Sequence, residues 1–208
     1  MPIDVVAWTQ PPERRAGTTL VVALHGRGSD GPAIAGIAPL LPDGITVAAP
    51  RGPILADGGF AWYRAHAVGQ PSAASLETIV TDLLAWLDDV AGVHEQVIVL
   101  GFSGGATTAA ALVLTDPTRF SGAVLLSGAI PLDAGLDVSD GRLAGVNVFW
   151  ANDPDDPVIT RSLVDRSETW LRTRSGATLT ERFYPDTGHS ITPTQTQDIH
   201  TFIASMMG

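Results

Sequence analysis

The stretch Val97–Gly105, with the sequence VIVLGFSGG, decides the fold. Its first four residues are apolar and predict a buried strand, and the alanine-rich run that follows the stretch predicts a helix. The pattern G-x-S-x-G joins the two, and Gly101 and Gly105 leave room for strand and helix to pack around a tight turn. Ser103 then projects its hydroxyl over the edge of the sheet, which makes it a candidate nucleophile. A glycine-rich turn that holds a serine by chance is the alternative.

Composition restricts the class of protein. The chain has 208 residues, 45% of them hydrophobic and 16% charged, so we expect one globular domain over residues 1–208. It has no cysteine, which excludes disulfides, thiol nucleophiles and cysteine-based metal sites. The net charge is −10, every basic residue is an arginine and no basic run occurs, so we expect no nucleic-acid partner.

Two kinds of targeting segment are missing from the sequence. The first residues, MPIDVVAWTQPPERR, contain no basic region followed by an apolar core, so we expect no signal peptide. No apolar run reaches the length of a membrane span, so we expect no stable membrane insertion. A cytoplasmic location is the expectation that follows.

Expected strands and helices alternate along the chain, apart from a long loop rich in glycine and proline at Pro50–Pro71. This alternation predicts an α/β fold with a mostly parallel, doubly wound sheet flanked by helices. We expect strands at Ile3–Trp8, Thr19–His25, Ile45–Ala49, Val97–Leu100, Ala123–Leu126, Val146–Trp150 and Ala177–Tyr184. We expect helices at Ala33–Leu41 and Ser72–Val90, from Ser103 to about Leu114, at Ile159–Arg174, and after Thr192, where Gln195 completes a capping box.

A nucleophilic serine needs a base, and five histidines compete for that role. His189 lies between the last expected strand and the last expected helix, at the carboxyl edge of a parallel sheet, where sites form. His25 ends a strand and precedes Gly26, a position that suits a structural role in orienting a loop. We therefore predict that His189 is the base.

Three aspartates compete to orient that base. Asp153, Asp155 and Asp156 follow the strand Val146–Trp150 in a single loop, and spacing alone does not choose among them. The two aspartates that do not orient the base are expected to form a solvated acidic turn. A calcium-binding loop is disfavoured, because the glycine and the distal glutamate of an EF-hand-type loop are missing.

The loop after the strand Thr19–His25 has a glycine on each side of Arg27. We predict that the backbone N–H groups of Arg27 and Gly104 form an oxyanion hole. The same loop matches G-x-G-x-x-G, the pattern of a dinucleotide site, but the acidic residue expected about twenty residues later is missing. The dinucleotide interpretation is therefore disfavoured.

Seven short motifs resemble those of a known family. LHGRGSD, APRGP, GGFAWYR, GFSGGA, LLSGAIP, DPDDPVI and TGHSI occur in the order seen in the phospholipase/carboxylesterase family of small serine α/β-hydrolases, which includes bacterial carboxylesterases and acyl-protein thioesterases. The resemblance implies the α/β-hydrolase fold. It also implies that Asp156 is the acid, because the family's acid directly precedes a Pro-Val pair.

Two places depart from the family pattern. Gly104 stands where the family commonly has a glutamine, which keeps the backbone donor and removes a side chain near the site. Asn152 and Asp153 stand where His-Gly is usual, so Asp155 stays open as an alternative to Asp156.

The resemblance implies a serine carboxylesterase that hydrolyses short- to medium-chain carboxylic esters through an acyl-enzyme on Ser103, without a metal or an organic cofactor. One alternative is an acyl-thioesterase or lysophospholipase of the same family. The other is a non-catalytic ligand-binding α/β-hydrolase homologue. The implied partner is a small-molecule ester, and apolar surface around an open cleft would also allow a homodimer.

We expect an open cleft, because too few residues lie between the fifth and sixth expected strands to form a cap domain. The loop Pro50–Pro71 is expected to wall the cleft, with Leu55, Trp62 and Tyr63 as substrate-binding residues. Trp62 has the alternative role of pinning the loop to the sheet. The Arg27 side chain, at the rim of the oxyanion hole, is predicted to favour substrates that carry an acidic group.

Overall fold

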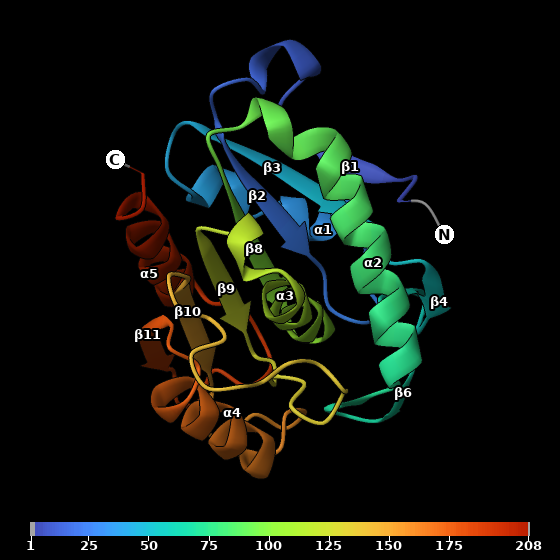
Figure 1. Cartoon of the computed structure of the whole chain (residues 1–208), viewed down its shortest axis with the longest axis vertical. Coiled ribbons are helices and arrows are strands. Elements are labelled where there is room, and N and C mark those ends of the chain that lie inside the picture. Colours follow the sequence, from blue (N-terminus) through green and yellow to red (C-terminus); the bar gives the residue numbers. More distant parts are fainter. Residues whose placement is uncertain (1–2, 208) are drawn as a thin grey trace.

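A seven-stranded sheet in the order β1-β3-β2-β8-β9-β10-β11 forms the centre of the molecule (Figure 1). The computed structural model describes residues 3–207, so residues 1, 2 and 208 of the expected domain lie outside the described part. Strand β1 runs antiparallel to β3, and every other neighbouring pair in this sheet is parallel. The expected mostly parallel, doubly wound sheet of the α/β-hydrolase fold is confirmed.

The strands and helices lie close to their expected positions. The strands of the main sheet are β1 Val6–Trp8, β2 Thr19–Leu24, β3 Ile45–Pro50, β8 Gln96–Phe102, β9 Gly122–Leu126, β10 Asn147–Asn152 and β11 Thr178–Phe183. The α-helices are α1 Gly31–Ala35, α2 Ala73–Val90, α3 Gly104–Thr115, α4 Arg161–Thr173 and α5 Pro193–Ala204. The capping box of α5 is confirmed, with both reciprocal hydrogen bonds between Thr192 and Gln195 present.

Helices cover both faces of the sheet (Figure 1). Residues of α2, α3 and α4 pack with one set of strand side chains, and residues of α1 and α5 pack with the other. Strand β2 alternates between the two, with Leu20 and Val22 on one face and Val21 and Ala23 on the other. This strand is apolar throughout because a parallel strand between two helical layers is buried on both faces. No helix within residues 3–207 is long and apolar enough to cross a membrane.

The helix expected at Ala33–Leu41 is wrong in its extent. The structure has the short α1, capped by the Asp30 side chain, and then a separate 3-10 turn at Ala38–Leu40. Pro39 has no N–H to donate to a preceding carbonyl, and Gly36 favours a helix end, so a continuous helix is interrupted here.

The long loop Pro50–Pro71 contains two small hairpins. Strand β4 Ile54–Ala56 pairs with β5 Gly59–Ala61, and β6 Ala65–Ala67 pairs with β7 Gln70–Pro71. The first turn is Asp57-Gly58, and both residues have positive φ angles, 52° and 83°. An Asp-Gly pair between short apolar runs is a strong signal for such a two-residue hairpin turn, and the sequence analysis missed it.

Glycines allow β2, β8 and α3 to approach one another closely. A methyl group on Gly105 would collide with the carbonyl oxygen of Leu24 in β2, and one on Gly101 would collide with the carbonyl oxygen of Gly105. A methyl group on Gly104, one residue before Gly105, would meet nothing closer than 3.8 Å. Close packing therefore requires glycine at position 105, whereas position 104 has room for a methyl group.

This difference predicts unequal effects of two neighbouring substitutions. Gly105→Ala should lower the free energy of unfolding by about 2–3 kcal/mol, because the added methyl forces backbone apart in a packed core. Gly104→Ala should change it by less than about 1 kcal/mol, since alanine also favours the helix. Urea unfolding followed by circular dichroism measures both variants. Equal stabilities of the two variants would contradict the packing argument.

Candidate active site

The Ser103 backbone adopts a conformation that is rare for a residue with a side chain. Its φ is 55° and its ψ is −119°. The residue lies between the end of β8 and the first turn of α3. The Ser103 N–H donates to the carbonyl oxygen of Leu126 in β9 at 2.9 Å, which ties the turn to the neighbouring strand. Such strained positions cost about 1–3 kcal/mol and persist at functional sites where the surrounding structure holds them.

Three side chains form one chain of hydrogen bonds at the carboxyl edge of the sheet. The Ser103 Oγ lies 2.9 Å from His189 Nε2, and His189 Nδ1 lies 2.7 Å from Asp156 Oδ2. The carboxylate accepts, so Nδ1 carries the proton and Nε2 is left to accept from the Ser103 hydroxyl. The loops after β8, β10 and β11 supply these residues. The arrangement can activate a serine hydroxyl as a nucleophile.

Asp156 is held by backbone donors as well as by the histidine. Its side chain is fully buried, and Oδ1 accepts from the N–H groups of Val158 at 2.7 Å and Ile159 at 3.0 Å. Asp155, the alternative left open by the sequence, is exposed to solvent. The geometry therefore favours Asp156 as the residue that orients His189.

The expectation of a solvated acidic turn is wrong for Asp153. This residue is 1% exposed, and its Oδ2 accepts from the Gly188 N–H at 2.7 Å, in the loop that carries His189. Its Oδ1 accepts from the N–H of Asp155 at 2.9 Å. These donors orient the carboxylate inward. The sequence contains no signal for this contact, because it joins two loops that are distant along the chain.

The Arg27 loop lies against the Ser103 turn on one side and the β4–β5 hairpin on the other. A methyl group on Gly26 would lie 3.5 Å from the Ser103 Cβ, and the Gly28 N–H donates to Phe60 O at 2.9 Å. A methyl group on Gly104 would lie 3.8 Å from the Arg27 nitrogen. No hydrogen bond within residues 3–207 uses the N–H of Arg27 or Gly104. Two backbone donors near Ser103 thus remain available to a substrate oxygen, as an oxyanion hole requires.

His25 has the structural role that its position predicted. Its buried Nε2 accepts from the Gly52 N–H at 3.0 Å, so Nδ1 carries the proton and donates to the Gly26 carbonyl oxygen at 2.8 Å. Burial lowers the pKa of His25, and the bond to Gly26 partly opposes this. Trp62 stacks near the ring and donates from Nε1 to the His25 carbonyl oxygen at 2.7 Å. The ring pair joins the start of the oxyanion loop to the long loop.

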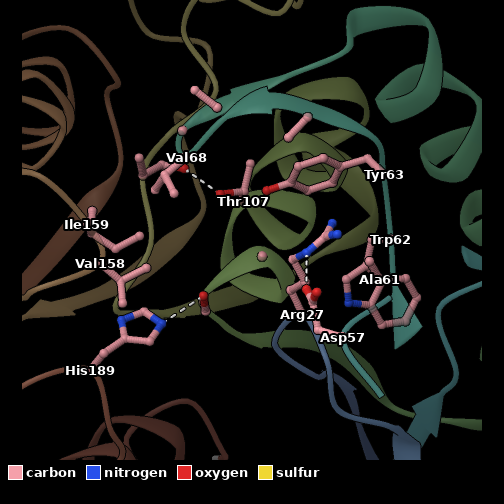
Figure 2. A pocket seen from close by; sticks show the side chains of 16 residues that line it. Arg27, Asp57, Ala61, Trp62, Tyr63, Val68, Thr107, Val158, Ile159 and His189 are labelled. Atoms are coloured by element: carbon pink, nitrogen blue, oxygen red, sulfur yellow. Dashed lines mark hydrogen bonds and ion pairs between the residues drawn. The ribbon is translucent and has the colours of Figure 1, made fainter. Parts of the chain in front are cut away.

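A cavity of about 500 Å³ opens beside Ser103 and His189 (Figure 2). Trp62 and Tyr63 line it as expected, so Trp62 both pins the loop and contributes to the wall. Leu55 does not line it, and its prediction as a substrate-binding residue is wrong. Leu55 is 81% exposed because it lies on the outer side of the β4–β5 hairpin. The sequence analysis did not predict most of the other lining residues, which are Asp57, Ala61, Ala65, Ala67, Val68, Gly69, Thr107, Ala129, Val158 and Ile159.

The Tyr63 hydroxyl is a polar group of the cavity wall that lies near Gly104. A methyl group on Gly104 would lie 3.8 Å from it, and Figure 2 shows the hydroxyl directed toward Thr107. Burial raises the pKa of Tyr63, and a hydrogen bond with Thr107 partly offsets the increase. The phenol is therefore protonated at neutral pH and can act as a donor.

Comparison with known proteins identifies the family. A model of the phospholipase/carboxylesterase family matches residues 7–207, almost the whole chain. The chain belongs to the phospholipase/carboxylesterase family. This family consists of serine hydrolases, so the protein is a hydrolase enzyme, and the predicted resemblance is confirmed.

Individual relatives in this family are distant in sequence and similar in structure. Acyl-protein thioesterase 1 of Candida albicans is 24% identical over an alignment of 229 positions, gaps included, that covers 99% of each chain. A carboxylesterase of Mesorhizobium loti is 25% identical with a TM-score of 0.80, covering 92% of this chain and 88% of that one. A carboxylesterase of Bacillus cereus shares the fold at 22% identity and a TM-score of 0.82, covering 97% and 93%.

The hydrolase carries an ion pair at the rim of its cavity. The Arg27 Nε lies 2.5 Å from Asp57 Oδ2, and the two side chains are 52% and 64% exposed. Figure 2 shows them side by side at the cavity wall. Asp57 belongs to the hairpin turn that the sequence analysis missed. The Arg27 charge predicted to attract acidic substrates is thus partly neutralised by a neighbour.

The two candidate acids can be separated by paired substitutions. Asp156→Asn should lower kcat by about 10⁴-fold, because an amide favours the wrong imidazole tautomer, as in other serine triads. Asp155→Asn should leave kcat within about twofold, since that carboxylate is exposed and lies outside the hydrogen-bond chain. Steady-state hydrolysis of p-nitrophenyl acetate measures both. Loss of activity in the Asp155 variant alone would transfer the role to Asp155.

Proposed function

We propose that the protein is a carboxylesterase that hydrolyses short- to medium-chain carboxylic esters through an acyl-enzyme on Ser103. The observation that supports this is the hydrogen-bond chain from Ser103 through His189 to Asp156, which opens onto a mostly apolar cavity. Membership in the phospholipase/carboxylesterase family supports the same class of reaction.

The proposed reaction has two steps with the same machinery. His189 Nε2 takes the Ser103 proton as Oγ attacks the ester carbonyl, and the N–H groups of Arg27 and Gly104 stabilise the oxyanion. The C–O bond to the alcohol breaks as His189 returns the proton to the leaving oxygen. Water, deprotonated by His189, then attacks the acyl-enzyme and releases the carboxylic acid and the free serine. Asp156 keeps the imidazole oriented in both steps.

The size and lining of the cavity suit an acyl group of limited length. Small residues form much of one wall, on the hairpin β6–β7 and near it, namely Ala61, Ala65, Ala67 and Gly69. Val158 and Ile159 form apolar wall on the side of Asp156. A volume of about 500 Å³ lies in the lower half of the range of ligand sites, roughly 300–1,000 Å³, and accommodates short and medium acyl chains.

A series of p-nitrophenyl esters with increasing acyl length tests this proposal. Wild-type protein should hydrolyse them with a maximum at short or medium length, because the cavity limits the chain it accepts. Ser103→Ala should lower kcat by about 10⁶-fold, because the nucleophile is lost. A fluorophosphonate should label wild-type protein on Ser103 and leave the variant unlabelled.

Two outcomes of these assays would contradict the carboxylesterase proposal. If folded wild-type protein neither hydrolyses any ester nor reacts with the fluorophosphonate, the carboxylesterase proposal is contradicted. The alternative of a non-catalytic ligand-binding homologue would then be favoured. Matched acyl thioesters test the second candidate, a thioesterase, which the similarity to acyl-protein thioesterase 1 favours. A kcat/KM that is at least tenfold higher for the thioester than for the oxygen ester would replace the carboxylesterase proposal.

Release of Arg27 from its ion pair should change selectivity. Asp57→Asn keeps a residue that tolerates positive φ and removes the charge that neutralises Arg27. An exposed ion pair is worth up to about 1 kcal/mol, so kcat/KM for an ester that carries a carboxylate should rise about fivefold relative to a neutral ester. Asp43→Asn, an exposed aspartate before β3 at the opposite edge of the sheet, is the charge control. Equal changes in both variants would show that only net charge matters.

A further inference from the structure

Few backbone hydrogen bonds attach the loop that carries His189 to the rest of the protein. It joins β11 to α5, and its local hydrogen bonds run from Thr187 Oγ1 to Tyr184 O and from Ser190 Oγ to Thr187 O. Of the backbone N–H groups at positions 185–191, only that of Gly188 donates to a residue outside the loop in the described structure. This bond, one residue before His189, is therefore the backbone attachment nearest to the proposed base. At the start of the loop the Tyr184 N–H donates to Asn152 O at 3.1 Å, and Tyr184 and Ile191 pack against the core.

The acceptor of that bond is the buried carboxylate of Asp153. It is 1% exposed and takes one N–H from the His189 loop and one from its own loop, at Gly188 and Asp155. Within residues 3–207, no cation lies within ion-pair distance of it. A buried carboxylate is stable only when such donors compensate for lost water, and a hydrogen bond to a charged acceptor is about twice as strong as a neutral one.

We propose that Asp153 is a positioning residue that fixes His189 relative to Ser103 by holding the Gly188 N–H, a role that rests on His189 acting as the base. Two carboxylates of the loop after β10 then have separate roles in positioning His189. Asp156 orients the imidazole ring, and Asp153 fixes the backbone from which the ring projects.

The bond to Asp156 alone does not define where Nε2 lies. It leaves the ring free to follow a shift of the His189 backbone, and Gly188, at a φ of 62°, is the most flexible residue type in the segment. The ring of Phe102 contacts the imidazole on one side at a centroid distance of 4.9 Å. Displacement of a catalytic group by about 1 Å can cost about 10²-fold in rate. Loss of the Asp153 carboxylate should therefore act on the chemical step.

Substitutions at Asp153 with a matched control test this role. Asp153→Ala should slow fluorophosphonate labelling of Ser103 and lower kcat for p-nitrophenyl acetate by about 10²-fold. KM should stay within about twofold, because Asp153 does not line the cavity. Asp153→Asn keeps an oxygen that can accept from Gly188 and should recover most of both rates. Asp155→Ala removes the same charge from the same loop and should leave both rates at the wild-type level.

Several results would overturn the role of Asp153. They are a wild-type labelling rate in Asp153→Ala, equally slow rates in Asp153→Asn and Asp153→Ala, or equal slowing in Asp155→Ala. Amide hydrogen exchange of the unmodified protein gives a further test that needs no variant to fold. The Gly188 amide should exchange at least tenfold more slowly than that of Ser190, and equal exchange would overturn the proposal. Wild-type protein that does not label at all would instead refute the proposed function on which the role rests.

Discussion

The unusual backbone of Ser103 is the constraint on which the rest of the site depends. A residue with a side chain at a φ of 55° is stable only if its neighbours leave it no alternative. Two contacts do this, the N–H bond to Leu126 in β9 and the close packing of Gly105 against Leu24 in β2. Both come from strands in the middle of the sheet, where the core is deepest. Ser103 is therefore positioned by the central strands of the sheet.

The partners of Ser103 are positioned in another way. His189, Asp156 and Arg27 lie on loops, which have no regular ladder of backbone hydrogen bonds to fix them. Side chains take over that function, because a carboxylate can accept from several backbone donors at once. The Arg27 loop is held similarly, with His25 bonded to Gly52 and the Trp62 indole bonded to the His25 carbonyl oxygen. Hydrogen bonds from buried polar side chains therefore fix these loops, whereas neighbouring strands fix Ser103.

The sequence predicted what periodicity and local pattern encode. The apolar run before Ser103 and the position of His189 after the last strand were sufficient to bring nucleophile and base to one edge of the sheet. The choice of Asp156 came only from the resemblance to the family, since three aspartates in one loop carry no period that tells which of them points inward. The exposure of Leu55 depended on a hairpin whose Asp57-Gly58 turn was present in the sequence and was overlooked.

The two departures from the family pattern have different physical consequences. Gly104 removes a side chain beside the oxyanion region, where the backbone nitrogen of Arg27 and the hydroxyl of Tyr63 both lie within contact distance of a methyl group at that position. Glycine at this position leaves the space beside the Tyr63 hydroxyl open. Asp153 adds a side chain beside the base, where it joins two loops. Gly104 leaves space open beside the cavity, and Asp153 attaches the loop of the proposed base. Asp153 thus gives the loop of the proposed base a buried attachment point at the edge of the sheet.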